Sequence, residues 1–251
     1  MRENPLALFV DQLSSHTRLT DEERGALLDL PIRGQAFRNE QTVVQREELV
    51  QNTCVVVSGL LARTSYTKEG DRQITCFYVK GEVPDLHSLV KPRATSGLRA
   101  MSDSEIARIP HSALQVLVRK YPGIAEAFSR ELVRESDIMA EWVVNLGRRT
   151  AKERIAHLFC ELAFKNGVAD GEEANFPFPV TQTALGDATG LSTVHVNRSL
   201  MSLRQDGVLR FEHGMAIIPN WPALAKVAGF DRDYLETPQP LRFTPEEAAA
   251  G

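Results

Sequence analysis

The sequence predicts an α+β fold in three parts: an N-terminal antiparallel, jelly-roll-like β-roll, one long helix, and a C-terminal winged helix-turn-helix. Three observations lead to it. β-branched runs separated by turn residues fill residues 32–109. Apolar residues then recur at alternating steps of four and three along residues 128–146. Finally, two short helical patterns flank Gly190, and two β-type runs follow them around His213-Gly214.

Composition sets limits on the function. The chain has 251 residues, 43% of them hydrophobic, which is enough for one or two cores. With a net charge of −4, any contact with nucleic acid must come from a local patch. The cysteines Cys54, Cys76 and Cys160 lack the spacing of a zinc or dithiol site, which favours a reducing, cytoplasmic location. No stretch reaches the ~18 apolar residues of a membrane span, so we expect no membrane association.

Residues 1–120 are predicted to form the β-roll, which we expect to act as a sensor. A helical segment at residues 5–30 comes first, with Thr20 and Glu23 as a capping box, and Pro31 ends it. The β-type runs that follow lie at residues 42–44, 54–57 and 74–79. No crossover helix fits between these runs, so the strands should be antiparallel.

Residues 121–147 are predicted to form a dimerisation helix. Its expected interface is a heptad seam with one charged interruption, Glu135. The seam residues are Phe128, Leu132, Met139, Trp142 and Leu146. The alternative is a core helix packed on the roll. We favour a dimer because a roll of this size has little surface to cover so long a helix, and because tryptophan is enriched at interfaces.

Residues 148–222 are predicted to form the winged helix-turn-helix, after a hinge at residues 147–150 and before a C-terminal tail at residues 223–251. A helix is expected at residues 151–165 and a loop at residues 166–179. Next come a short helix at residues 182–188 capped by Thr181, a turn at Gly190, and a second helix capped by Ser192. The small Gly186 lies where the two helices must approach closely.

The second helix carries the chemistry for DNA recognition on one face. Val196, Leu200 and Leu203 point one way, and Val194, Arg198, Met201 and Gln205 point the other. Arg198 can pair with guanine, Asn197 with adenine or a phosphate, and Val194 with a thymine methyl group. In the predicted wing, Arg210 and His213 can contact the DNA backbone. The complete set of expected DNA-binding residues is Thr181, Gln182, Ser192, Thr193, Val194, His195, Asn197, Arg198, Met201, Arg204, Arg210 and His213.

The segments RTAKERIAHLFCELA (149–163) and LGDATGLSTVHVNRSLMSLRQDGVL (185–209) resemble the Crp/Fnr family of bacterial transcription regulators, and the likeness spans residues 5–222. The resemblance implies a homodimer that binds double-stranded DNA at a near-palindromic operator and recruits RNA polymerase. Arg198 matches the arginine common in the family, and Thr193, Val194 and Asn197 occupy the variable positions. Val194 stands where some members have glutamate, so the operator sequence stays open.

The resemblance also bears on what the roll binds. Members that bind cyclic nucleotides carry a Gly-Glu pair and, about ten residues later, an arginine that grips the phosphate. This chain has Gly81-Glu82, but Arg93 is out of register and precedes Ala94, which argues against cyclic AMP. The lack of any cysteine before Cys54 argues against an iron-sulfur cluster.

A haem is also not expected, because His87 lacks the neighbouring cysteine of haem-containing relatives. If the roll holds a ligand pocket, Gly81, Glu82, His87 and Arg93 are its expected residues. We expect an unidentified small-molecule effector or none, no cofactor and no metal.

The two other classes of function are an enzyme and a ligand-binding or scaffolding protein. The chain has no nucleophile elbow, metal-spaced His/Glu set or phosphate-binding glycine loop, so we expect no catalytic residues and no enzyme. A ligand-binding or scaffolding protein that has lost operator binding is the alternative. The presence of Arg198 and Asn197 on the second helix argues against it.

Overall fold

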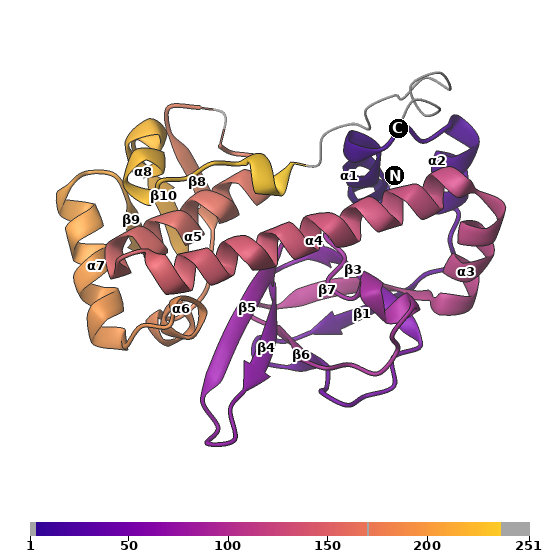
Figure 1. Ribbon diagram of the computed structural model, residues 1–251, viewed down its shortest axis with the longest axis horizontal. Coiled ribbons are helices and arrows are strands. Elements are labelled where there is room, and N and C mark those ends of the chain that lie inside the picture. Colours follow the sequence, from indigo (N-terminus) through magenta and orange to yellow (C-terminus); the bar gives the residue numbers. More distant parts are fainter. Residues whose placement is uncertain (1–3, 170, 237–251) are drawn as a thin grey trace, which may run out of the picture.

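The computed structural model describes residues 4–169 and 171–236. It shows the predicted α+β fold, in which a long helix, α4 (Pro122–Arg148), runs across the molecule and connects two units (Figure 1). The strand-rich unit precedes α4 in the chain, and a smaller unit with most of the remaining helices follows it.

The N-terminal segment forms two helices, α1 (Ala7–His16) and α2 (Asp21–Leu28), where the sequence pattern indicated one helical stretch. The break is at Thr17, whose extended backbone ends α1. The predicted capping box is confirmed at the start of α2. Thr20 Oγ1 accepts a hydrogen bond from the Glu23 amide over 3.2 Å, and Glu23 Oε2 accepts one from the Thr20 amide over 2.9 Å.

The β-roll consists of two antiparallel sheets, as predicted. One sheet has the order β1-β7-β3 and the other β2-β6-β4-β5. The strands are β1 (Arg33–Phe37), β2 (Thr42–Val44), β3 (Asn52–Ser58), β4 (Leu61–Tyr66), β5 (Arg72–Tyr78), β6 (Gly97–Ala100) and β7 (Ser104–Pro110). A 3₁₀ helix, η1 (Leu86–Leu89), lies between β5 and β6, and α3 (His111–Lys120) precedes α4.

The C-terminal unit is built on α5 (Ala151–Lys165). It adds α6 (Gln182–Thr189), α7 (Thr193–Gln205), α8 (Trp221–Ala228) and the 3₁₀ helix η2 (Asp233–Leu235). A three-stranded sheet completes it, with the order β8-β10-β9. Its strands are β8 (Ala174–Pro177), β9 (Arg210–Glu212) and β10 (Met215–Ile218).

Two expectations for this unit are corrected. The expected loop at residues 166–179 contains β8, which forms because residues 174–177 pair with β10 far along the chain. The expected tail is folded as far as η2, because Leu224, Ala228 and Leu235 are buried in the core. The rest of that tail, residues 237–251, lies outside the described residues.

The two units share one continuous hydrophobic core. Phe77 of β5 meets Phe178 of the C-terminal unit edge to face, with ring centroids 5.2 Å apart. On the surface, Arg72 Nε of β5 lies 2.7 Å from Asp187 Oδ2 of α6. The helix-turn-helix is therefore packed directly against the β4–β5 hairpin of the roll.

Candidate nucleic-acid interface

The helix-turn-helix is formed by α6 and α7, and its turn has the predicted local structure. Thr181 Oγ1 accepts a hydrogen bond from the Ala184 amide over 3.1 Å, and Ser192 Oγ accepts one from the His195 amide over 3.4 Å. Each hydroxyl thus caps the first turn of its helix. Gly190 adopts a left-handed conformation with φ +63°, which glycine tolerates without the Cβ strain of other residues.

Gly186 allows the turn to lie close to α6. A Cβ atom at this position would be 2.5 Å from the Leu191 carbonyl oxygen and 3.8 Å from Val196 Cγ2 of α7. The predicted close approach is confirmed, and its tightest contact is with the turn that precedes α7.

The two faces of α7 separate as the helical spacing predicted. Val196 and Leu203 are fully buried against the unit's core. On the opposite face, Val194 is 65% exposed and Met201 is 56% exposed. Two exposed apolar side chains beside polar neighbours form a surface suited to a partner that offers both methyl groups and hydrogen-bonding edges.

Arg198 lies between these two side chains on the exposed face of α7. Within residues 4–169 and 171–236, no hydrogen bond or ion pair engages its guanidinium group. The five N–H donors of an arginine in this state are available for paired hydrogen bonds to a ligand.

Other predicted residues already have partners. Asn197 Nδ2 donates a hydrogen bond to Gln182 Oε1 of α6 over 3.4 Å, which joins the exposed ends of the two helices. His195 Nδ1 lies 3.0 Å from Ser192 Oγ. Arg204 Nη1 lies 3.0 Å from Glu212 Oε1 of β9, so this arginine connects α7 to the wing.

A shallow hollow on the surface brings half of the predicted set together. Its lining residues are Gln182, Thr193, Val194, Asn197, Arg198, Met201, Ser202 and Gln205. The other six predicted residues lie outside this lining, either at the caps or toward the wing: Thr181, Ser192, His195, Arg204, Arg210 and His213. Ser202 and Gln205 also line the hollow but are not in the predicted set. The position of Ser202 one turn beyond Arg198 could have identified it, and the sequence pattern assigns Gln205 only to the exposed face of the helix.

The wing is formed by β9 and β10. His213 and Gly214 make its turn, both with positive φ, +52° and +74°. Arg210 and His213 are exposed, so both side chains remain available for contact with a DNA backbone.

On α4, two of the five expected interface residues are turned into the subunit. Phe128 and Trp142 are each 5% exposed, and Trp142 lies 6.3 Å from the ring of Phe77 in the roll. The seam that includes them therefore packs partly against the chain itself, and Leu132, Met139 and Leu146 are half-buried at its edge.

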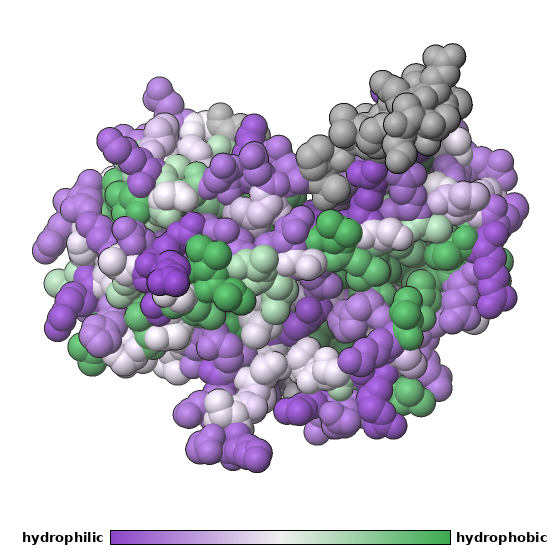
Figure 2. All heavy atoms as spheres, in the orientation of Figure 1, coloured by the Kyte–Doolittle hydropathy of each residue, from purple (hydrophilic) through white to green (hydrophobic). Residues whose placement is uncertain are grey.

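The face of α4 that is open to a partner lies one residue further along the chain. We call it the outward stripe: Ser129, Val133, Ser136, Ala140, Val143 and Gly147, all exposed and again spaced by four and three. Val133 is 55% exposed and Val143 is 68% exposed. Figure 2 shows green, apolar atoms recurring along the line that α4 follows in Figure 1.

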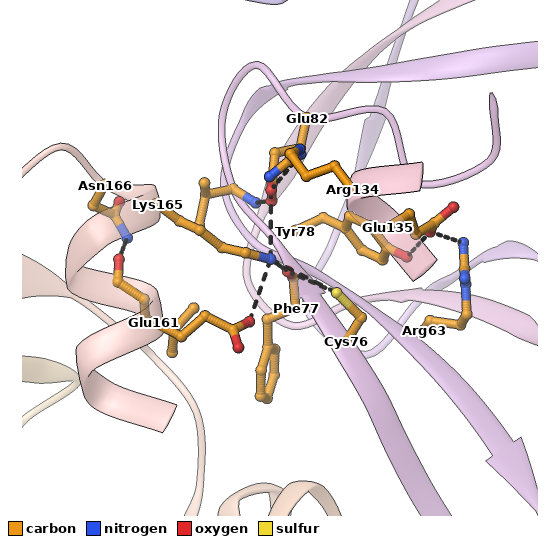
Figure 3. Close-up of polar contacts among 12 residues, drawn as sticks. Arg63, Cys76, Phe77, Tyr78, Glu82, Arg134, Glu135, Glu161, Lys165 and Asn166 are labelled. Atoms are coloured by element: carbon orange, nitrogen blue, oxygen red, sulfur yellow. Dashed lines mark hydrogen bonds and ion pairs between the residues drawn. The ribbon is translucent and has the colours of Figure 1, made fainter. Parts of the chain in front are cut away.

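Apart from the adjacent Gly81 and Glu82, the residues of the expected ligand pocket lie in different surroundings. Glu82 is buried between the two units, where it is paired with Arg134 and Lys165 (Figure 3). Arg93 instead lies at the surface, with its side chain 64% exposed and its Nη1 donating to the Glu47 carbonyl over 3.1 Å. His87 is half-buried in η1, and burial lowers the pKa of its imidazole.

The described part of the structure contains neither a metal-binding cluster nor a membrane-spanning helix. Over the part of the chain that it describes, no group of three or more His, Cys, Asp or Glu side chains is arranged to hold a metal ion. Cys54, Cys76 and Cys160 are buried, free thiols. Among the described helices, none combines the length and apolar character needed to cross a bilayer.

Two family models match the chain. A Crp-like helix-turn-helix domain matches residues 153–227, and a cyclic nucleotide-binding domain matches residues 35–121. Among relatives, the fumarate and nitrate reduction regulatory protein of Escherichia coli (strain K12) is 23% identical over 224 residues, 89% of this chain and 90% of that protein. The transcriptional activator protein FnrL of Cereibacter sphaeroides is 24% identical over 218 residues, 85% and 87% of the two chains.

Solved structures show the same fold. FixK2 from Bradyrhizobium japonicum superposes with a TM-score of 0.71 at 23% identity, covering 79% of this chain and 98% of that one. A CooA mutant from Carboxydothermus hydrogenoformans has a TM-score of 0.64 at 14% identity, covering 91% and 97%.

Proposed function

Because this chain belongs to the Crp/Fnr family of DNA-binding transcription regulators, we propose that it acts as a homodimer that recognises a near-palindromic operator through α7. In this function it is a regulator and not an enzyme, and it acts in the cytoplasm together with RNA polymerase.

The observation that carries this proposal is the exposed face of α7. Arg198, which none of the described residues engages, lies between exposed Val194 and Met201, and this combination matches what a major groove offers, namely guanine acceptors beside thymine methyl groups. Gln182 and Asn197 border the same hollow and can position this face against phosphates or an adenine.

The outward stripe supports the homodimer. Its serine, alanine and glycine residues allow two helices to approach closely. Val133 and Val143 supply apolar surface that is exposed in the single chain. Two copies joined along this stripe would present two α7 helices related by two-fold symmetry, which requires an operator with the same symmetry.

We further propose that the roll does not hold cyclic AMP. Tyr78, Glu82, Arg134 and Lys165 line a cavity of ≈ 10 Å³ between β5 and α4, which is at the lower limit for one water molecule. Glu82, Arg134 and Lys165 also border a larger, open hollow of ≈ 780 Å³, which is lined by residues of α1 and not by Tyr78. The effector is then an unidentified small molecule that binds elsewhere, or none, and we propose no iron-sulfur cluster, haem or other cofactor.

Two measurements test this function. In a mobility shift with a random-sequence duplex pool at low salt, we expect a retained fraction that loses affinity as salt rises. The absence of any retained fraction would favour the alternative of a scaffolding protein without operator binding. Cyclic AMP at millimolar concentration should leave the melting temperature unchanged, whereas a stabilisation of roughly 2.7 kcal/mol would indicate a ligand at ~100 times its dissociation constant.

A further inference from the structure

One lysine of the DNA-binding unit is buried where that unit meets the roll. Lys165 is the last residue of α5, and its side chain is only 3% exposed. Its Nζ donates a hydrogen bond to the Phe77 carbonyl of β5 over 2.9 Å and lies 3.4 Å from Glu82 Oε1. In Figure 3 the ammonium group lies between α5 and the strands of the roll.

Charges from three parts of the chain surround this ammonium group. Glu82 follows β5 and is shared with Arg134 of α4, whose Nη2 lies 3.4 Å from Glu82 Oε1. Arg134 is also held by Glu131, one turn earlier on α4, at 2.6 Å. On α5 itself, Glu161 Oε1 lies 3.5 Å from Lys165 Nζ. The cluster therefore joins the roll, the long helix and the DNA-binding unit.

The ammonium group of Lys165 remains charged in this position. Burial opposes the charge, but Cys76 and the carboxylates of Glu82 and Glu161 together raise the lysine pKa above its ordinary value. Removing one partner from a buried ion pair leaves the other charge uncompensated, so separating Lys165 from Glu82 would be costly.

The position of α5 determines the position of the DNA-recognition helices. Arg154 Nη1 of α5 donates to the Thr189 carbonyl at the end of α6 over 3.1 Å. Near the start of α5, Lys152 is paired with Asp206, the residue that caps the end of α7. A displacement at Lys165 would thus move α6 and α7 as a body relative to α4.

We propose that Lys165 is a positioning residue for DNA recognition: its ammonium group, held against Glu82 between the two units, fixes the orientation of α7 relative to α4. The inference rests on the proposed function, because orientation relative to α4 matters only when two copies bind one operator. Two α7 helices must then lie at the separation and angle that the two half-sites require. Lys165 fixes that geometry without touching DNA.

The test compares a full operator with a single half-site. Lys165→Met keeps most of the side chain's volume and removes the charge. We expect the variant to fold and dimerise, to bind one half-site with wild-type affinity, and to lose at least ~5-fold in affinity for the full operator, a coupling typical of linked sites. Lys226→Met, an exposed lysine on α8 in the same unit, is the control and should lose nothing.

Each outcome is decisive. Equal losses on both DNAs would mean that the variant damages the recognition surface itself, and unchanged binding to both would mean that Lys165 positions nothing; either result overturns the inference. If Lys165→Met does not fold, the double variant Lys165→Met/Glu161→Gln replaces it, because this variant removes one negative charge together with the positive one. If the double variant also fails to fold, Lys165 is needed for folding and the proposal is overturned. A wild-type chain with no preference for the full operator would instead overturn the proposed homodimeric function.

Discussion

The indole Nε1–H of Trp142 on α4 donates a hydrogen bond to Glu161 Oε2 on α5 over 2.9 Å, within one subunit. Glu161 is 1% exposed, and burial raises the pKa of its carboxyl group. Trp142 therefore belongs to the core that joins the roll to the DNA-binding unit. The surface of α4 that we propose for a second copy is therefore the outward stripe.

Val143→Asp should convert the protein to a monomer. Val143 is 68% exposed in the single chain, and in a dimer along the outward stripe its carboxylate replacement would be buried against its symmetry mate. Light scattering at micromolar concentration measures the change. Val116→Asp is the control, because Val116 on α3 is 62% exposed and lies off the stripe. A dimeric Val143→Asp variant would show that the subunits associate through another surface.

Gly186→Ala should destabilise the helix-turn-helix although alanine is the better helix former. The added Cβ would lie 2.5 Å from the Leu191 carbonyl oxygen, and such overpacking costs about 1 to 3 kcal/mol. Gly25→Ala in α2 is the matched control, since nothing lies within 4 Å of its added Cβ. Denaturant unfolding should show Gly25→Ala gaining up to ~1 kcal/mol from helix propensity. A gain for Gly186→Ala as well would disprove the tight turn.

Stability should also depend on the ionisation of Asp85. Its Oδ1 accepts a hydrogen bond from the Cys54 amide over 2.8 Å, and burial raises its pKa to about 6. In the unfolded chain the pKa of Asp85 is ~3.9. Between pH ~3.9 and about 6 the folded state therefore binds more protons than the unfolded state, and the folded state loses stability as the pH rises through this range. The cost of ionisation at neutral pH is about 3 kcal/mol.

Asp85→Asn removes this titration. The unfolding free energy of the variant minus that of the wild type should rise by about 2 kcal/mol between pH ~4 and pH ~6.5. Denaturant unfolding at both pH values gives this difference directly, and the constant effect of the substitution itself cancels. A difference that does not change with pH would mean that Asp85 is not held in its raised-pKa state.

Local patterns predicted the recognition unit well, and contacts between distant segments explain the rest. A few neighbouring residues are enough to predict the roles of Thr181, Gly190 and Ser192, because caps and turns depend on local backbone geometry. β8 could not be found in this way, because its strand forms only by pairing with β10. Likewise, the cluster around Lys165 joins three segments that no local spacing connects.

The burial of Phe128 and Trp142 on α4, two of the five expected interface residues, has a different physical cause. The seam with Trp142 and the outward stripe have the same spacing and differ by one residue, so periodicity alone does not tell which of them faces the roll. The contacts of Trp142 with Phe77 and Glu161 inside the subunit show that the seam with Trp142 faces the roll and the DNA-binding unit.

Arg210→Ala should weaken binding to all DNA sequences alike. Arg210 is exposed at the start of the wing strand β9, where a phosphate is the expected contact. A homodimer loses one such contact in each subunit, so the slope of log affinity against log salt should fall by about 2. The measurement is a salt titration on operator and random duplexes, with the exposed Arg119 of α3 changed to alanine as the control. A loss confined to one operator position would instead make Arg210 a base-reading residue.

The most direct test of the account is selection from a random duplex library with wild type and Arg198→Ala in parallel. The wild type should enrich a two-fold symmetric consensus with one strongly preferred guanine in each half-site. Arg198→Ala should lose about 1 to 3 kcal/mol on that sequence and relax the preference at that guanine alone, because its guanidinium pairs with guanine O6 and N7. An identical consensus with uniformly weaker binding would make Arg198 a phosphate contact and contradict the placement of α7 in the major groove.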